Sequence, residues 1–545
     1  MAIKFYCLEY DIKMVHACYY PTSYIESYIE SRNNDVTCVD GSISHSDIAD
    51  TFARTFSKVY TVDDSNAKRS IHERFSKSFS SYNDAHKNDS LKPFLISWSE
   101  FLVCLSKIKT GKATGSFVKP QHVLLGSPLL SIHLHFLFNA LIQHQYVPND
   151  FLHTIVTPII KDTSGNHSDS TNYRPVTLSS LVSQLFEHAI SIKISHLLWT
   201  DELQFGFKPK HSTAHALFVL NETVNYFTTH GSNVFVTFLD CSKAFDKVPH
   251  DGLFLKLIER GVPLCFINIL IYWLSNLTSQ CRWRESLSKA YAVSSGVKQG
   301  GILSPMLFTV FMNDLLIQLR NNGDGCNINA VFYGAIMFAD DLALCAPSRR
   351  AMQKMLRLCE EYCRDCCLSF NAKKTKSLLF GKNASALKPV PLMLNNESIE
   401  FVQEWKYLGC HVVGGKEFGF SSRQDLSKFR NSANALLSAV RRPSEQVQMM
   451  LLYSFSVPIL TYASEVKTFS YSDMYDCHVA MNDAIRKIFR YNRWESIRSL
   501  RSLSGYRDIF TLFAIRRRSF LARLPHMGNV TVSRLLRFIS SSVTT

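Results

Sequence analysis

The sequence predicts an α+β fold in which helices back an antiparallel sheet. Residues 331–346 read VFYGAIMFADDLALCA, two apolar runs around an acidic pair, which indicates a β-hairpin with largely buried strands. Residues 234–239, VFVTFL, are rich in β-branched and aromatic residues and predict another strand, which ends at Asp240. Helices are expected from Ser304 through Asp314, where Pro305 suits the first turn, and from Ser421 onward.

The acidic pair of the hairpin, Asp340 and Asp341, points to a metal site. Two adjacent carboxylates repel each other and are costly to desolvate, and a divalent cation would offset that cost. A solvated Asp-Asp turn is the simpler explanation of such a dipeptide when it stands alone. If the strand that ends in Asp240 lies beside the hairpin, the metal is favoured, because three carboxylates at converging strand ends can hold two ions that serve an in-line phosphoryl displacement.

Length and composition indicate a large globular protein with a basic C-terminal quarter. The chain has 545 residues, of which 46% are hydrophobic, so it can bury a sizeable core. Its net charge is +15, and residues 421–545 hold 19 basic and 8 acidic residues, a net charge of +11. This distribution suits a polyanion such as nucleic acid. An anionic membrane surface would also suit it, but no apolar stretch is long enough to span a bilayer.

The cysteines favour a reducing compartment. The 15 cysteines show no disulfide-framework spacing, and no secretory signal precedes them. Cys359, Cys363 and Cys366 recur at helical spacing, which predicts a buried helix face rather than a zinc site. We therefore expect an intracellular protein.

Five motifs in a fixed order resemble the reverse transcriptases of non-LTR (LINE-like, jockey-type) retrotransposons. They are FLDCSKAFDKVPH at 238–250, SSGVKQGGILSPMLFTVFMNDL at 294–315, FADD at 338–341, LSFNAKKTKSLLF at 368–380 and EWKYLGCHV at 404–412. The resemblance implies a right-hand polymerase with fingers, a palm built on the antiparallel sheet, and a helical thumb.

The resemblance also implies a division of the chain. We expect a linker-like region over 1–90, a helical N-terminal extension over 91–151, the reverse transcriptase domain with fingers, palm and primer grip over 152–412, and a helical, basic thumb and C-terminal region over 413–545. In the family an endonuclease domain comes before the linker, and we expect this chain to lack it.

Catalytic roles follow from the motif positions. The resemblance implies that Asp240, Asp340 and Asp341 hold two Mg²⁺ ions, with Mn²⁺ as an alternative. Lys374 stands where polymerases keep a lysine that protonates the leaving pyrophosphate, a sensible place for a general acid. Lys373 and Lys376 lie close enough in sequence to compete for this assignment.

Nucleotide binding is expected from fingers and palm. A strand over 154–161, a polar loop and a strand over 172–178 predict the fingers hairpin. Lys161 and Arg174 match the family's fingers cations, which neutralise the triphosphate. The ring of Phe245 is expected to exclude a ribose 2′-hydroxyl, and Gln299 to reach the nucleotide or the template base.

Four further motif positions complete the expectations for the reverse transcriptase domain. Tyr407, Leu408 and Gly409 are expected to form a turn that holds the 3′ end of the primer. Asp246 is interpreted as structural, because its place in the motif is off the metal face.

The thumb is expected to present a basic helix face. Arg486, Arg490 and Arg493 recur at i, i+4 and i+7, with Lys487 adjacent. Such a face suits a duplex backbone, where phosphate contacts position the protein without reading sequence. A solvated helix face explains the same spacing equally well.

The resemblance implies an RNA-directed DNA polymerase, a nucleotidyltransferase. Its expected partners are an RNA template, a DNA primer or RNA/DNA duplex, and dNTPs. We expect it in the nucleus or in a cytoplasmic ribonucleoprotein and not at a membrane. The oligomeric state is left open. A group II intron maturase is a rival, which KAFDKVPH and YLG disfavour. The other alternative is an inactive retrotransposon-derived protein that binds nucleic acid without polymerising.

Overall fold

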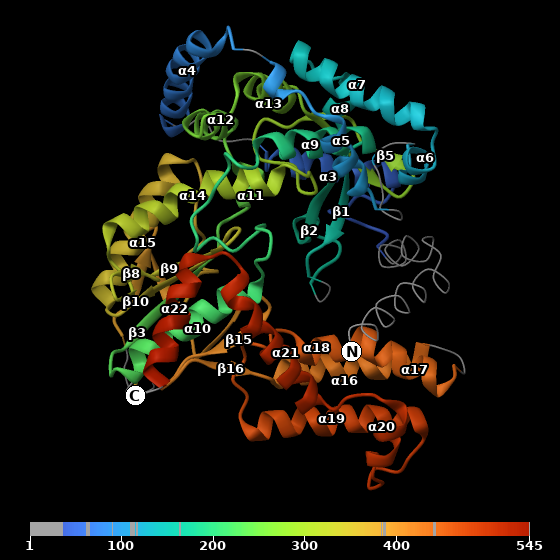
Figure 1. Cartoon of the computed structure of the whole chain (residues 1–545), viewed down its shortest axis with the longest axis vertical. Helices are drawn as coiled ribbons and strands as arrows, with labels where there is room; N and C mark the ends of the chain where they lie inside the picture. Colours follow the sequence, from blue (N-terminus) through green and yellow to red (C-terminus); the bar gives the residue numbers. More distant parts are fainter. Residues whose placement is uncertain are drawn as a thin grey trace. The chain divides into compact units, whose positions relative to one another are not determined.

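The computed structural model describes residues 36–60, 66–89, 91–109, 115, 118–162, 165–382, 384, 389–439 and 443–543. Residues 1–35 of the predicted linker-like region lie outside this part. The chain forms two compact units that interleave along the sequence (Figure 1). Unit 1 takes residues up to 199, 243–311 and 364–368, and unit 2 takes 200–242, 312–363 and 369–545. Both combine helices with sheets, which confirms the α+β class.

Unit 1 is built on a five-stranded sheet in the order β2-β1-β4-β5, with β6 beside β4. β1 (His153–Ile160) pairs antiparallel with β2 (Tyr173–Leu178) and parallel with β4 (Thr278–Trp283). β5 (Ser286–Leu287) and β6 (Tyr291–Ala292) are short. The predicted strand, loop and strand over 154–178 are confirmed.

Helices surround this sheet and contribute aromatic side chains to its core. Phe52 on α3 packs against Tyr173 and Trp283, with ring centroids 4.8 and 5.3 Å away. The helices of unit 1 are α3 (His45–Ser57), α4 (Asn66–His86), α5 (Trp98–Ser106), α6 (Pro120–Leu124), α7 (Pro128–His144), α8 (Asn149–Leu152), α9 (Leu181–Ile194), α11 (Ala244–Lys247), α12 (His250–Glu259) and α13 (Leu264–Ser275).

Unit 2 contains a six-stranded sheet in the order β12-β13-β11-β3-β10-β9. Its strands are β3 (Val234–Leu239), β9 (Ala335–Phe338), β10 (Asp341–Ala346), β11 (Lys376–Phe380), β12 (Leu392–Leu394) and β13 (Glu397–Phe401). All neighbours pair antiparallel except β11 and β13, which are parallel. The sheet is therefore mixed, not purely antiparallel as predicted.

The predicted hairpin over 331–346 forms, but its first strand is shorter than expected. Residues 331–332 belong to β8 (Val331–Phe332), which pairs with β7 (Asn327–Ile328). The break falls at Gly334, where the ring of Phe332 folds back so closely that a Cβ would lie 2.6 Å from it. The apolar run thus continues through a bend that hydrophobicity alone does not reveal.

Beyond residue 403 a small sheet precedes a helical region. β14 (Glu404–Tyr407), β15 (Cys410–Val413) and β16 (Gly419–Ser421) form the sheet.

The helices of unit 2 are α10 (Thr213–Thr229), α16 (Arg423–Ala439), α17 (Glu445–Leu451), α18 (Val457–Thr461), α19 (Tyr471–Phe489), α20 (Arg498–Ser504), α21 (Ile509–Arg523) and α22 (Val530–Val543). Two more helices, α14 (Ser304–Asn322) and α15 (Arg349–Asp365), cross the unit boundaries. Phe429, Met449, Met481, Ile485 and Ile509 are among the side chains that form the common core of α16–α21.

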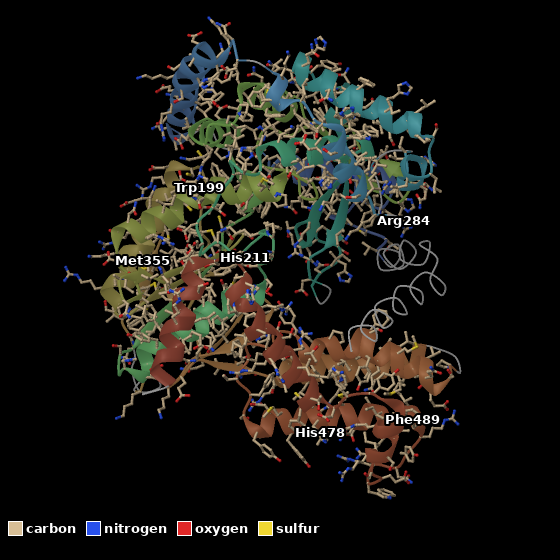
Figure 2. All side chains as sticks on the ribbon, in the orientation of Figure 1. Trp199, His211, Arg284, Met355, His478 and Phe489 are labelled. Carbon is tan, nitrogen blue, oxygen red and sulfur yellow. The ribbon has the colours of Figure 1, made fainter. Side chains whose placement is uncertain are left out.

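The interpretation of the cysteine-bearing helix is largely confirmed. On α15, whose Met355 is labelled in Figure 2, Cys359 and Cys363 are buried. Cys366 lies just beyond the helix and is partly exposed. Among the described helices, none is both long enough and apolar enough to cross a membrane.

Candidate active site

Strand register brings the predicted metal-binding aspartates to one end of the six-stranded sheet. Leu239 of β3 lies opposite Leu342 of β10, so the next residues on the two strands are Asp240 and Asp341. The β9–β10 hairpin is closed by Ala339 and Asp340, because Phe338 pairs with Asp341. Three carboxylates from segments a hundred residues apart in sequence therefore gather where β3 ends and β10 begins.

These carboxylates influence one another electrostatically. Burial first, then the charges of Asp340 and Asp240, raise the pKa of Asp341 from its ordinary 3.8 to about 6. Asp341 is nevertheless an exposed residue, and the Asp240 side chain is 43% exposed. The site thus combines repulsion between like charges with an open face toward solvent.

Lys374 is the lysine of its motif that approaches the acidic group. Its Nζ lies 3.9 Å from Asp240 Oδ2, a loose and solvent-exposed pair. Asn371 holds the local turn, since its backbone N–H donates to the Asp240 carbonyl (2.9 Å) and its Oδ1 accepts from the Lys374 N–H (3.2 Å). Lys376 instead pairs with Glu400 at 2.7 Å, and Lys373 is exposed.

The donor set suits a hard divalent cation, although the protein alone does not enclose one. In the described part of the chain, no three His, Cys, Asp or Glu side chains stand close enough together to hold a metal ion. Mg²⁺ commonly takes one or two carboxylates and completes its shell with water and substrate phosphates. The acidic group with the raised pKa of Asp341 fits that kind of open site, because a cation would relieve the repulsion among the carboxylates.

The predicted turn at Tyr407, Leu408 and Gly409 connects β14 to β15. Tyr407 pairs with Cys410, and Leu408 and Gly409 between them both have positive φ, +45° and +80°. Such a turn matches the twist of a tight hairpin. Tyr462 supports it, because its hydroxyl donates to the Leu408 carbonyl (2.9 Å) and its ring lies against Gly409.

The predicted fingers cations lie in unit 1. Arg174 pairs with Ile159 across β1 and β2, and Lys161 lies two residues beyond Ile159, so both cations share one face of the hairpin. Both are exposed. The Lys161 ammonium donates to the Thr171 carbonyl at 2.8 Å, which holds it at the start of the loop.

The segments that carry Phe245 and Gln299 contact each other within unit 1. The Phe245 carbonyl accepts from the Val297 N–H (2.8 Å), and its ring stacks on Phe308 with centroids 4.0 Å apart. The Gln299 Nε2 donates to Asp246 Oδ1 at 2.7 Å. Asp246 is buried and engaged in this contact, which agrees with its structural interpretation.

A buried ion pair fixes the loop that carries Gln299. Lys298 Nζ lies 2.5 Å from Glu187 Oε1, and the two side chains are 7% and 2% exposed. Glu187 Oε2 accepts from the backbone N–H groups of Ile302 (2.6 Å) and Leu303 (3.0 Å). The Lys298 ammonium also lies 4.7 Å from the centre of the Trp273 ring. Sequence reasoning missed Glu187, because nothing links it to the motif except the fold.

The basic helix face predicted over 486–493 is wrong. α19 ends at Phe489, which is labelled in Figure 2, and Arg490 adopts a left-handed conformation with φ +57°. Arg493 therefore lies beyond the helix. Arg486 is bound internally, since its Nε donates to the Glu495 carbonyl (2.9 Å) and its Nη1 pairs with Asp483 (2.9 Å).

Basic side chains instead gather around two hollows in the helical region. The first, of about 380 Å³, is lined by residues that include Arg430, Lys487, Tyr491 and Arg493. The second, of about 580 Å³, is lined by residues that include His478, Arg498, Arg501, Arg507 and Asp508. The arginines at 430, 498, 501 and 507 show no regular spacing, which is why the sequence did not single them out.

Comparison with known proteins finds a family that matches the middle of the chain. Residues 160–412 match the family described as Reverse transcriptase (RNA-dependent DNA polymerase). The chain is 26% identical over 347 residues to the probable RNA-directed DNA polymerase from transposon BS of Drosophila melanogaster, an alignment covering 60% of this chain and 37% of that protein.

Two further relatives agree. The probable RNA-directed DNA polymerase from transposon X-element of Drosophila melanogaster is 27% identical, over 55% of this chain and 33% of that protein. The RNA-directed DNA polymerase from mobile element jockey of Drosophila funebris is 26% identical, over 66% and 40%. The chain thus spans between a third and two fifths of these relatives. The reverse transcriptase match thus covers residues 160–412, and the chain is similar to RNA-directed DNA polymerases of transposons and of the mobile element jockey.

Proposed function

We propose that this chain is an RNA-directed DNA polymerase that extends a primer 3′-hydroxyl with dNTPs on an RNA template. The observation that carries the proposal is the convergence of Asp240, Asp340 and Asp341 at the end of β3 and the start of β10, inside the region that matches the reverse transcriptase family. Two Mg²⁺ ions, or Mn²⁺ in their place, would lower the pKa of the primer hydroxyl and neutralise the developing phosphate charge.

Other residues are proposed to bind and orient the substrates. Lys161 and Arg174 neutralise the triphosphate, and Arg174 can do so with forked hydrogen bonds. Phe245 limits the space beside the sugar, and Gln299 approaches the nucleotide or template base. Lys374 supplies a proton to the departing pyrophosphate.

The β14–β15 turn and the helical region are proposed to hold the primer and the duplex. Tyr407, Leu408 and Gly409 hold the primer's 3′ end. In the helical region, basic residues contact the phosphate backbone without reading sequence. In this assignment the six-stranded sheet is the palm, the β1–β2 hairpin belongs to the fingers, and α16–α21 form the thumb.

Primer extension on poly(rA)/oligo(dT) with dTTP tests the proposal. The wild-type chain should extend the primer with Mg²⁺ and stop when EDTA is present. Asp341→Asn should abolish extension yet bind the primer–template with wild-type affinity, because it removes a metal ligand while keeping the shape of the side chain. Asp84→Asn, on the exposed surface of α4, removes the same charge and should extend normally.

Two outcomes would contradict this assignment. If Asp341→Asn loses duplex binding along with extension, the variant is misfolded or the residue has another role. If the wild-type chain binds the duplex but extends nothing with Mg²⁺ or Mn²⁺, the inactive nucleic-acid-binding alternative is correct.

A further inference from the structure

The turn that presents Asp340 and Asp341 has an unusual backbone. Ala339 adopts φ +59°, in the left-handed region that glycine favours and alanine seldom enters. It follows β9, which is the last strand in the order of the six-stranded sheet. A strained turn at the end of an edge strand persists only where surrounding groups fix it.

Residues 203–206 supply that support along the outer edge of β9. The Met337 N–H donates to the Leu203 carbonyl (2.9 Å), and the Phe205 N–H donates to the Met337 carbonyl (2.8 Å). A Cβ on Gly206 would lie 2.3 Å from the Ala339 nitrogen, so this approach requires glycine. The segment therefore extends the sheet by a short parallel pairing that reaches the turn.

The side chain of Gln204 binds both backbone polar groups of Ala339. Its Oε1 accepts from the Ala339 N–H (3.0 Å) and the Gly206 N–H (2.8 Å), and its Nε2 donates to the Ala339 carbonyl (3.4 Å). Gln204 has no exposed surface. Because a buried amide without partners is costly, these bonds specify one arrangement of turn and amide.

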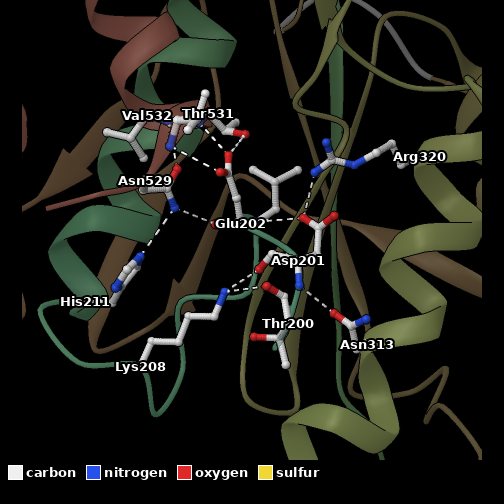
Figure 3. A network of polar contacts seen from close by, with 12 residues as sticks. Thr200, Asp201, Glu202, Lys208, His211, Asn313, Arg320, Asn529, Thr531 and Val532 are labelled. Atoms are coloured by element: carbon white, nitrogen blue, oxygen red, sulfur yellow. Dashed lines mark hydrogen bonds and ion pairs between the residues drawn. The ribbon is translucent and has the colours of Figure 1, made fainter. Parts of the chain in front are cut away.

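The loop that carries Gln204 is itself tied down (Figure 3). Asp201 pairs with Arg320 at 2.7 Å, and its N–H donates to Asn313 Oδ1 at 2.6 Å, both on α14. Glu202 accepts from the Thr531 N–H (2.6 Å) and the Val530 N–H (3.3 Å) at the start of α22. The residues just before Gln204 are thus held by α14 and by the start of α22.

We propose that Gln204 is a positioning residue for the Asp340–Asp341 pair: its amide holds Ala339 in the left-handed conformation from which both carboxylates project. The link to catalysis rests on the proposed polymerase function, whereas the hold on the turn does not. Mg²⁺ demands near-ideal octahedral geometry, so small displacements of its ligands should be felt strongly. Partners that orient metal ligands commonly contribute ten- to a hundredfold to activity or metal affinity.

The test replaces Gln204 with Met, which keeps the length and removes the polar atoms. Gln353→Met is the matched control, because the Gln353 amide binds both backbone groups of Met393 in the same way, at 2.9 Å each, away from the acidic group. Hydrogen–deuterium exchange of the peptide over 335–345 is measured alongside primer extension.

In Gln204→Met, exchange over 335–345 should accelerate about tenfold or more, while α10 and α15 keep their wild-type protection. The kcat with Mg²⁺ should fall by about ten- to a hundredfold with unchanged primer–template affinity. Mn²⁺ should restore part of the loss. Gln353→Met should match wild type in both measurements.

Unchanged exchange over 335–345 would overturn the proposal, and so would faster exchange throughout unit 2, which would indicate general destabilisation. An equal loss of kcat with Mg²⁺ and Mn²⁺ would remove the link to ligand geometry. If the wild-type chain fails to extend primers, the proposed function falls, and the exchange data still decide whether Gln204 holds the turn.

Discussion

Asp341 holds its proton more tightly than an ordinary aspartate, because burial and the carboxylates of Asp340 and Asp240 disfavour its charged form. A carboxyl whose pKa is raised on folding stabilises the folded state below its unfolded pKa, near 3.8. That contribution is lost as the pH rises through the folded pKa of about 6. The same charge that weakens the metal-free fold at neutral pH is what a cation would bind.

We therefore expect wild type to lose stability relative to Asp341→Asn between about pH 4 and pH 7 in EDTA. Adding Mg²⁺ should raise the Tm of wild type more at pH 7 than at pH 5, since the ion binds the deprotonated carboxylate. Thermal unfolding of both proteins across this range measures the effect. Parallel stability curves for the two proteins would mean that Asp341 is not the group that titrates.

A second prediction for a single residue concerns the ring of Phe245 and the choice between ribo- and deoxynucleotides. Phe245→Ala should increase ribonucleotide incorporation relative to deoxynucleotides, because the ring that would clash with a 2′-hydroxyl is gone. The substitution also removes the ring that stacks on Phe308. Phe308→Leu therefore serves as the control, since it disturbs the same contact but keeps the Phe245 ring. An unchanged rNTP/dNTP ratio in Phe245→Ala, measured by competing primer extension, would exclude Phe245 as the sugar gate.

The loop between Gly296 and Leu303 contains a buried ion pair. Glu187 on α9 neutralises Lys298 and receives two backbone N–H groups at the start of α14. Removing one partner of a buried pair leaves an uncompensated charge, whereas replacing both with apolar residues is often close to neutral.

Glu187→Met should therefore destabilise the protein by about 3–5 kcal/mol, and the double variant Glu187→Met/Lys298→Met should recover part of that loss. Urea unfolding of the two variants and of Lys298→Met completes a double-mutant cycle. If the double variant is no more stable than Glu187→Met, the backbone contacts of Glu187 outweigh its pairing with Lys298.

Local patterns predicted the strands of the acidic group better than they predicted helix ends. β3 and the strands of the β9–β10 hairpin are short apolar runs, and aspartates mark where β3 ends and where the hairpin turns. Apolar composition therefore predicts these strands, and the aspartates predict their ends. α19 stops at Phe489 with Arg490 in the left-handed conformation, although no Gly or Pro marks the end and the arginine spacing continues. Spacing cannot show that the chain leaves the helix.

In the molecule as a whole, contacts between segments far apart in the chain could not be predicted from the sequence. The two units interleave along the chain, whereas a linear reading assigns consecutive domains. Gln204 reaches Ala339 across 135 residues, and Glu202 reaches Thr531 across 329. Motif order indicated which aspartates belong together, but only the fold identifies the side chains that hold them.

In the basic C-terminal quarter, we expect the duplex backbone to bind at the first hollow of the helical region, which is lined by residues that include Arg430, Lys487 and Arg493. These three side chains are exposed, whereas Arg486 is committed to Glu495 and Asp483. Each phosphate contact releases condensed counterions, so the log–log salt slope changes by about 0.9 per contact on B-form DNA.

Replacing Arg430, Lys487 and Arg493 together with Gln should weaken duplex binding and flatten the salt slope by about one to three contacts' worth, without changing sequence preference. The control replaces Arg69, Arg74 and Lys77 on α4 with Gln, which removes the same charge from another exposed surface. Binding titrations at several salt concentrations compare the two triple variants with wild type. If both weaken binding equally, the effect is one of net charge. If the variant at this hollow binds like wild type at every salt concentration, its basic residues only solvate the helices, and duplex contact must be sought elsewhere on the chain.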